Sequence, residues 1–126
     1  MSGYLLDTHV ILRWLSDQKK LSAAARSAIA DGAHPVYLSS AAAWEMAIKK
    51  SLGRLDYPSN LEEVLAEDEI EVLPIKLAHA LAVADLPIHH HDPFDRMQIA
   101  QARIERLVLV TQDSILAKYD VETLAG

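Results

Sequence analysis

Short apolar runs alternate with longer helix-like segments along the chain. The runs lie at residues 4–6, 36–38, 70–75 and 107–110, and we predict a strand in each. Between them, apolar residues recur at the three- and four-residue spacing of a helix face. Strands that alternate with helices form parallel sheets covered by helices on both faces. The pattern therefore predicts an α/β fold built on a parallel sheet.

Capping and stop residues indicate where the helices begin and end. Ser22 is suited to cap a helix that ends before Gly32, and Asp92 followed by Pro93 marks another helix start. Asn60 and Glu63 have the spacing of a capping box. Further helices are expected around residues 10–15, 41–52 and 77–84, from 93 to about 106 and from 114, followed by a short strand near 121. Trp14 and Trp44 lie on apolar helical stripes, so we expect both in the core.

The composition is that of one globular domain. The 126 residues suffice for one core, so we expect a single domain over residues 1–126. With 12 basic and 18 acidic residues the net charge is −6, which disfavours non-specific coating of nucleic acid. The lack of cysteine excludes disulfides and thiolate metal sites. No apolar stretch suits a bilayer span and the first ten residues do not resemble a signal peptide, so we expect a cytoplasmic protein.

Acidic side chains fall where the predicted strands end. Asp7 directly follows the first strand, and Asp113 follows the fourth. The helix before the fourth strand runs antiparallel to it, which brings Asp92 and Asp95 at its start to the same edge. Glu45 lies about one and a half turns into the helix after the second strand and reaches this edge if its face points inward. Ligands of open α/β sheets bind beyond the carboxyl ends of the strands, so we expect a site here.

Several carboxylates at one edge point to a metal ion. Two unit charges ~6 Å apart repel by about 3 kcal/mol at an effective dielectric constant of ~20, so a close cluster takes up protons or holds a cation. Carboxylate oxygens without cysteine suit Mg²⁺ or Mn²⁺. Such an ion activates water and neutralises charge on a phosphoryl group.

Each acid also has a purely structural interpretation, with one exception. Asp92 and Asp113 can cap the helices that follow them, and Asp95 can interact with a helix dipole alone. Glu45 has the spacing of a surface ion pair with the lysine four residues later. Asp7 is the exception, because an acid that closes a buried central strand has no routine structural role.

Other motifs carry less information. Residues 89–91 are three consecutive histidines, which cannot easily all face one ion, and we interpret them first as a solvated loop near the site. The sequence contains no P-loop, no dinucleotide-binding glycine motif, no zinc-protease helix and no nucleophile elbow.

Four segments together resemble a known family. The segments LLDTHVILRWL, LSSAAAWEMAIKKSLGRL, HHHDPFDRMQIAQA and LVLVTQDSIL occur in the order and spacing of PIN-domain ribonucleases. They are most similar to the VapC-type toxins of bacterial toxin–antitoxin pairs, and the resemblance covers nearly the whole chain. It implies an α/β/α sandwich on a short parallel sheet and a metal-dependent endoribonuclease.

The resemblance also implies roles for individual residues. The acids that would hold Mg²⁺ or Mn²⁺ for the hydrolysis of RNA phosphodiester bonds are Asp7, Glu45, Asp95 and Asp113. Auxiliary polar groups would be Thr111, Thr8 and Ser39, whereas Asp92 remains a cap. Relatives often carry arginine at the position of Gln112, so one phosphate contact is missing here. Candidate contacts to the RNA backbone are Lys49, Lys50, Arg54, Arg96 and Arg103.

Two protein partners are implied as well. One is an antitoxin whose tail covers the active-site groove, and the other is a second copy of the chain. Apolar positions on the helices before Gly32 and Gly53 could form the dimer interface or belong to the core. The RNA target, the cut site and the number of metal ions are left open.

Three alternative functions have weaker support. A PIN-like protein without activity would only bind a partner, and metal-dependent cleavage distinguishes it from the enzyme. A receiver domain would have an aspartate at the end of the third strand, where this chain has Leu73 and Pro74. A haloacid dehalogenase-type phosphatase needs a second aspartate two residues after Asp7, where this chain has His9.

Overall fold

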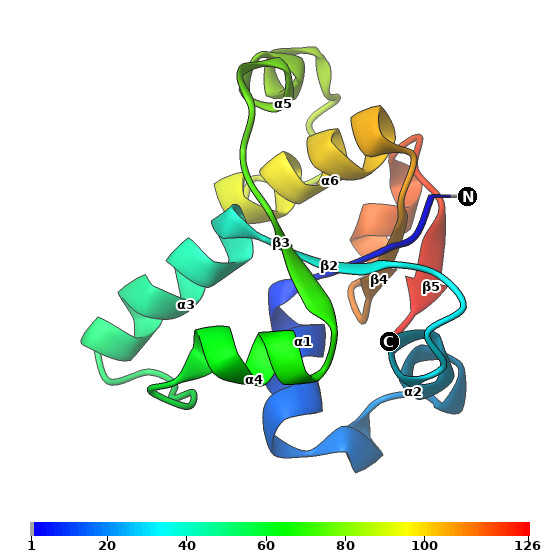
Figure 1. Ribbon diagram of the computed structural model, residues 1–126. Coiled ribbons are helices and arrows are strands. Elements are labelled where there is room, and N and C mark those ends of the chain that lie inside the picture. Colours follow the sequence, from blue (N-terminus) through cyan, green and yellow to red (C-terminus); the bar gives the residue numbers. More distant parts are fainter. Residues whose placement is uncertain (1) are drawn as a thin grey trace.

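Five short strands pair in parallel in the computed structural model, which describes residues 2–126 (Figure 1). They are β1 (Tyr4–Leu6), β2 (Val36–Ser39), β3 (Ile70–Leu73), β4 (Val108–Thr111) and β5 (Thr123–Ala125), in the spatial order β3-β2-β1-β4-β5. Leu5 in the central strand lies opposite Tyr37 in β2 and Leu109 in β4. The predicted α/β fold with a parallel sheet is confirmed.

Six α-helices connect the strands. They are α1 (Thr8–Ser16), α2 (Ala23–Ala30), α3 (Ser40–Ser51), α4 (Leu61–Glu67), α5 (Leu77–Ala82) and α6 (Pro93–Glu105). Short 3-10 turns cover Gln18–Lys20, Val83–Asp85 and Ser114–Lys118. In the part of the chain that the structure describes, no helix is long and apolar enough to cross a membrane.

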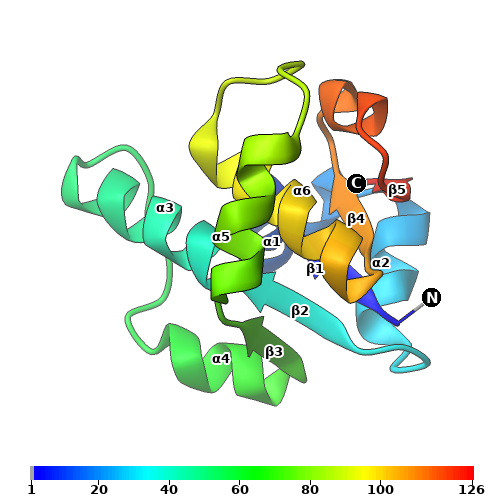
Figure 2. The same ribbon diagram turned by 90° about the horizontal axis from the view of Figure 1, so that it is seen from above.

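Two hydrophobic clusters lie on opposite faces of the sheet. Leu6 of β1 and Val110 of β4 belong to the cluster beneath α1, α2, α3 and α4, whereas Leu5 and Leu109 belong to the cluster beneath α6. Neighbouring residues of a strand point to opposite faces, so each of these strands supplies both clusters. Figure 1 shows the resulting layers, with α5 and α6 on one side and α1, α2 and α4 on the other. Viewed from above in Figure 2, α5 lies against α6.

The ends of several elements differ slightly from the prediction. The fourth strand begins at Val108 rather than at residue 107, because the Leu107 amide still donates to the Ala102 carbonyl at the end of α6. Arg106 ends that helix in the left-handed conformation (φ 56°). The last strand starts at Thr123, two residues beyond the expected position.

Two predictions about side chains were wrong. Asn60 precedes α4, but its side chain makes no capping hydrogen bond, so the expected capping box does not form. Trp44 is 61% exposed rather than buried, because the core-facing side of α3 is formed by Ala42 and Met46. Trp14 packs against the core as expected.

Candidate active site

The strand order reverses between β1 and β4, and acidic residues lie on both sides of this point. Asp7 directly follows β1 and Asp113 follows β4 by two residues. A crevice forms where neighbouring strands lead to connections on opposite sides, which is where open α/β sheets bind ligands. Asp95 in the first turn of α6 and Glu45 on α3 are delivered to the same region by the two helices.

Asp7 is almost completely buried and tied to β4. Its side chain is 3% exposed and caps α1 by accepting from the Val10 amide at 2.9 Å. The Thr111 hydroxyl donates to the other carboxylate oxygen and accepts from the Asp113 amide at 3.0 Å. Burial raises the pKa of Asp7 above its ordinary value of 3.8, against the lowering effect of the Thr111 and Val10 hydrogen bonds. Thr111 thus links the two acids that flank the reversal point.

Glu45 is held in place by a polar network of its own. It is 4% exposed, and it accepts hydrogen bonds from the Thr8 hydroxyl and from Lys49 Nζ, each at 2.6 Å. The ion pair with Lys49 that the sequence suggested is therefore present. It is not a surface pair, because the Glu45 carboxylate is buried. Thr8 directly follows Asp7 in the chain, and its hydroxyl donates to Glu45. It therefore connects the two acids.

Asp95 carries the largest electrostatic perturbation of the site. Burial, followed by the neighbouring charges of Asp92, Asp7 and Glu45, raises its pKa to about 7, although His90 acts in the opposite direction. The effect of Asp7 and Glu45 on Asp95 indicates that acids from three separate segments share one electrostatic environment. A carboxyl group poised in this way is typical of functional sites.

Asp92 has the capping role expected for it. Its carboxylate accepts from the amides of Phe94 at 2.8 Å and Asp95 at 3.0 Å, with Pro93 in the first helical turn. This cap fixes the start of α6 and with it the position of Asp95.

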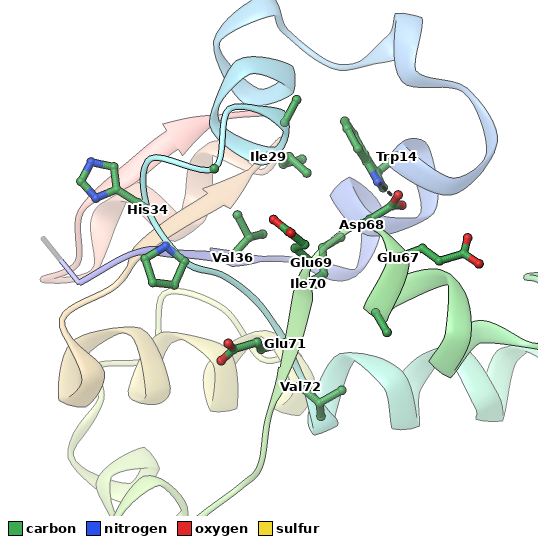
Figure 3. Close-up of a pocket in the computed structure, with 14 residues that line it drawn as sticks. Trp14, Ile29, His34, Val36, Glu67, Asp68, Glu69, Ile70, Glu71 and Val72 are labelled. Carbon is green, nitrogen blue, oxygen red and sulfur yellow. Dashed lines mark hydrogen bonds between the residues drawn. The ribbon is translucent and has the colours of Figure 1, made fainter.

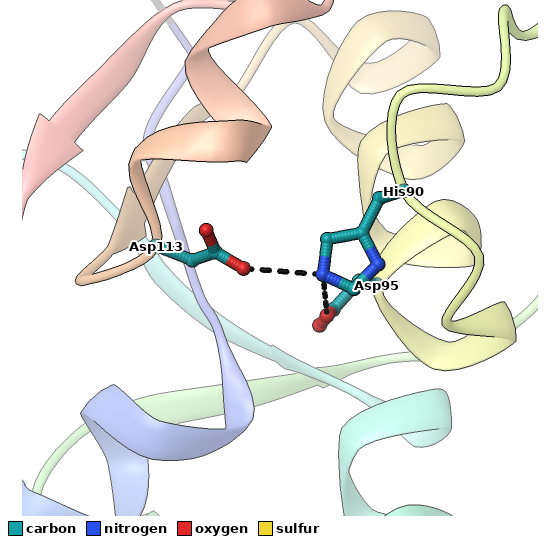
Figure 4. Close-up of side chains that lie close together, drawn as sticks. All are labelled: His90, Asp95 and Asp113. Atoms are coloured by element: carbon teal, nitrogen blue, oxygen red, sulfur yellow. Dashed lines mark hydrogen bonds and ion pairs between the residues drawn. The ribbon is translucent and has the colours of Figure 1, made fainter.

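A histidine lies between two of the acids (Figure 4). His90 Nε2 is 3.1 Å from an oxygen of Asp113 and 3.4 Å from an oxygen of Asp95. Candidate ligand atoms of these three residues all lie within 4.8 Å of one another. Asp7 and Glu45 do not belong to this group, but their charges act on Asp95. The sequence indicated a loop near the site at residues 89–91 without singling out His90.

The donor set fits a hard divalent cation. Asp7, Glu45, Asp95 and Asp113 offer carboxylate oxygens, which Mg²⁺ and Mn²⁺ prefer. A cation would relieve the repulsion that, after burial, raises the pKa of Asp95. A cation is therefore compatible with this edge of the sheet on the chemistry of the residues alone.

Two residues expected at the site have their polar groups engaged elsewhere. The Ser39 hydroxyl donates to Gln101 Oε1 at 2.5 Å and accepts from the Ala41 amide at 2.9 Å, so it joins β2 to α6 and caps α3. The Arg96 guanidinium donates to main-chain carbonyls of the preceding loop, including those of Pro87 at 2.9 Å and Val83 at 3.2 Å. We therefore leave Ser39 and Arg96 out of the proposed site.

The remaining candidate cations differ in their surroundings. Lys50 donates to the Tyr57 carbonyl at 3.1 Å, lies over the Tyr57 ring and pairs with Asp56 at 3.3 Å. Arg103 faces Asp120 at 3.9 Å, and Arg54 is exposed beyond the end of α3. Lys49 is the only one of the five candidates that contacts an acid of the site in the described residues, through Glu45.

The residues that hold the histidine loop were not foreseen from the sequence. The hydroxyl of Tyr119 accepts from the amides of His89 at 3.1 Å and His90 at 2.8 Å, and the ring of His89 lies edge-on to that of Tyr119. Tyr119 is about 30 residues away in the chain, and nothing in the local sequence signals this contact.

A broad hollow on the surface lies away from the acidic edge. It measures about 950 Å³ and lies beside the amino ends of β2 and β3, lined by residues that include Val36, Ile70 and Trp14 (Figure 3). The Trp14 indole donates to Asp68 at 3.0 Å across it. The amino and carboxyl ends of parallel strands lie at opposite edges of a sheet, so we assign the chemistry to the other edge, where the perturbed acids converge.

Comparison with known proteins identifies the family. Residues 4–122 match the PIN domain, so the chain belongs to the PIN domain family. PIN domains are generally nucleases. No curated protein matches the chain in sequence.

Solved structures show the same fold in bacterial complexes. A chain of VapBC2 from Rickettsia felis, crystallised with a DNA fragment from their promoter, has a TM-score of 0.74 at 15% identity, with 96% of each chain covered. A chain of DNA-bound VapBC from Salmonella typhimurium has a TM-score of 0.71 at 19% identity, with 98% of each covered. A chain of FitAcB from Neisseria gonorrhoeae has a TM-score of 0.64 at 23% identity, with 97% of this chain and 96% of that chain covered. The expected PIN fold is confirmed.

Proposed function

We propose that the protein is a Mg²⁺- or Mn²⁺-dependent endoribonuclease and the VapC-type toxin of a toxin–antitoxin pair, with residues 1–126 forming one catalytic domain. The observation that carries the proposal is the convergence of Asp7, Glu45, Asp95 and Asp113 at the carboxyl edge of the sheet. Family membership supports nuclease chemistry, and the fold shared with chains of VapBC complexes supports the toxin assignment. A cytoplasmic location follows from the proposed RNA substrate.

In this proposal the acids share the binding of the cation. Asp7 and Asp95 hold it, and Asp113 and Glu45 complete the pocket directly or through water. When bound, a divalent cation activates a water molecule and offsets the negative charge that develops on the scissile phosphodiester. Thr111 and Thr8 orient the acids, through Asp7 and Asp113 on one side and Glu45 on the other.

Basic residues near this edge are proposed to contact the RNA backbone. Lys49 is the strongest candidate because its ammonium already lies 2.6 Å from Glu45. Lys50, Arg54 and Arg103 follow as weaker candidates, and each would contribute through phosphate contacts that carry no sequence information.

The chain is also proposed to bind an antitoxin and to form a homodimer. One of the solved complexes with this fold is a toxin–antitoxin complex from Klebsiella pneumoniae, with a TM-score of 0.62 at 18% identity. Trp44 and Ile48 of α3 and the C-cap residue Leu52 are 61%, 37% and 61% exposed and recur every four residues, so they form an exposed apolar stripe. We assign this face to the dimer. The apolar residues of α2, by contrast, belong to the core.

A cleavage assay on a pool of cellular RNA tests the enzymatic function. Purified protein free of antitoxin is incubated with RNA in Mg²⁺, in Mn²⁺ and in EDTA, beside the Asp7→Asn variant. We expect discrete fragments that require metal and disappear in the variant. Intact RNA in every reaction, from folded protein, would contradict nuclease activity and favour a PIN-like protein that only binds its partner.

A further inference from the structure

The tautomer of His90 is fixed by a hydrogen bond on the side of the ring that faces away from the acids. Nδ1 lies 3.0 Å from the Asp92 amide, which can only donate, so Nδ1 is the acceptor. In a neutral imidazole the other nitrogen then carries the hydrogen. Nε2–H therefore points at Asp113 (3.1 Å) and Asp95 (3.4 Å) as a donor.

This arrangement places a donor where a cation would need to bind. Asp95 and Asp113 would each offer a carboxylate oxygen to a divalent cation at this edge of the sheet. The Nε2–H of His90 already faces both oxygens (Figure 4). His90 cannot serve as a ligand through Nε2 in this tautomer, because that nitrogen has no free lone pair.

The main chain that carries His90 is anchored by hydrogen bonds that do not involve its ring. The amides of His89 and His90 donate to the Tyr119 hydroxyl, and Arg96 donates to the carbonyls of Pro87 and His90. The His90 side chain is 20% exposed. A rotation of the side chain that moves Nε2 away from the two carboxylates leaves these main-chain hydrogen bonds in place and gives up the bond from the Asp92 amide to Nδ1.

We propose that His90 is a positioning residue that competes with the divalent cation: its Nε2–H bridges Asp95 and Asp113 in the metal-free protein and turns away when the cation binds. This inference rests on the proposed function, because it takes the acidic edge as the metal site. The bridge occupies acceptor oxygens of Asp95 and Asp113 that the cation would use, and so lowers the affinity with which the cation is taken up.

Metal affinity, rather than activity, tests the proposal. His90→Asn keeps a polar atom near the position of Nδ1 but removes the donor at Nε2, whereas His90→Gln keeps an amide donor near Nε2. Mn²⁺ is titrated into antitoxin-free protein at one fixed pH, and free Mn²⁺ is measured by electron paramagnetic resonance. We expect His90→Asn to bind Mn²⁺ about tenfold more tightly than wild type, which corresponds to about 1.4 kcal/mol. His90→Gln and the exposed control His91→Asn should remain near wild type.

The possible outcomes separate this inference from the proposed function. Weaker Mn²⁺ binding by His90→Asn would make His90 a ligand, and unchanged binding would mean that the bridge has no effect on the metal; either result overturns the inference alone. Failure of wild type and all variants to bind Mn²⁺ would overturn the proposed metal dependence and the inference together.

A second measurement needs no variant. In isotopically labelled wild-type protein, saturation with Mg²⁺ should shift the NMR signals of the His90 ring while those of His91 stay in place. His90 signals that do not move at saturating Mg²⁺ would contradict the release of the bridge.

Discussion

At the scale of single residues, Asp7 combines a structural and a chemical role in one carboxylate. One oxygen caps α1 through the Val10 amide, and the other accepts from Thr111 at the end of β4. Two partners would satisfy an ordinary buried carboxylate, yet burial still raises the pKa of Asp7. The Asp7 carboxylate is therefore held in place while its negative charge is incompletely compensated, which suits a residue that binds a cation.

Thr111 should matter for both stability and activity. Thr111→Val keeps the size of the side chain but removes the hydroxyl that serves Asp7 and the Asp113 amide. We expect a loss of about 1–3 kcal/mol in the free energy of unfolding, because buried polar groups lose their partner, together with slower cleavage. Chemical denaturation and RNA cleavage measure the two effects. Thr111→Ser keeps the hydroxyl and should retain most of both, and an equal loss in the serine variant would assign the effect to the methyl group.

The raised pKa of Asp95 predicts a pH dependence of stability. The folded protein holds a proton on Asp95 up to about pH 7, whereas the unfolded chain releases it near the ordinary value of 3.8. The folded state thus binds more protons between these values, so the free energy of unfolding falls as the pH rises through this window and is constant above it. With 21% of the side chain exposed, we expect a loss on the order of 2 kcal/mol from pH 5 to pH 8 in EDTA.

Urea denaturation of wild type and Asp95→Asn at the two pH values isolates this contribution. The variant should lack this part of the pH dependence, because its amide does not titrate. Equal slopes in the two proteins would show that Asp95 titrates normally in the folded state.

At the scale of elements, the start of α6 determines where Asp95 lies. Asp92 caps the helix, and Pro93 stands at a position where no amide is needed. The same helix returns to β4, so its first turn lies over the edge where Asp113 follows the strand. The segment from Asp92 to Asp113 is thus one unit that brings two acids of the site together.

The structural interpretation of Asp92 makes a clear prediction. Asp92→Ala removes the acceptor for two amides and should lower the free energy of unfolding by about 1 kcal/mol, whereas Asp92→Asn keeps the cap. Thermal unfolding and Mn²⁺ titration of both variants test this. Asp92→Asn should bind Mn²⁺ and cleave RNA much as wild type does, and loss of metal binding in this variant would make Asp92 a ligand.

The sequence predicted elements well where the pattern is local. Apolar runs and helical periodicity place all five strands to within a few residues, and Ser22 and Asp92 cap the helices expected of them. The acids after β1 and β4 and at the start of α6 could be brought to one edge by topology alone.

What the sequence could not predict depends on distant contacts. The exposure of Trp44 depends on which side of α3 meets the core, and an apolar stripe looks the same in either case. The hydroxyl of Ser39 donates to Gln101, which is 62 residues away in the chain. The His90 amide donates to the hydroxyl of Tyr119, which is 29 residues away. Periodicity and spacing carry no signal for such pairs.

At the scale of the whole molecule, the net charge of −6 must be reconciled with an RNA substrate. Acids concentrated at the edge of the sheet repel a polyanion until a cation neutralises them. The proposed function therefore requires the metal for RNA binding as well as for cleavage.

The exposed apolar face of α3 predicts an effect on assembly. Leu52 is 61% exposed at the end of that helix, so Leu52→Glu should leave the fold intact and disrupt the proposed dimer. Light scattering coupled to size-exclusion chromatography measures the mass, with Leu77→Glu on the exposed face of α5 as the matched control. A dimer that survives Leu52→Glu but not Leu77→Glu would move the interface to α5, and a monomeric wild type would contradict the dimer.

The most direct test of the account compares one buried and one exposed aspartate. RNA cleavage in Mg²⁺ is measured for wild type, for Asp7→Asn and for Asp120→Asn, whose side chain is 97% exposed away from the acidic group. We predict metal-dependent cleavage by wild type and Asp120→Asn, and none by Asp7→Asn, with all three proteins folded because the substitution keeps the size of the side chain. Cleavage by Asp7→Asn at the wild-type rate would contradict the claim that the carboxyl edge of the sheet is the active site.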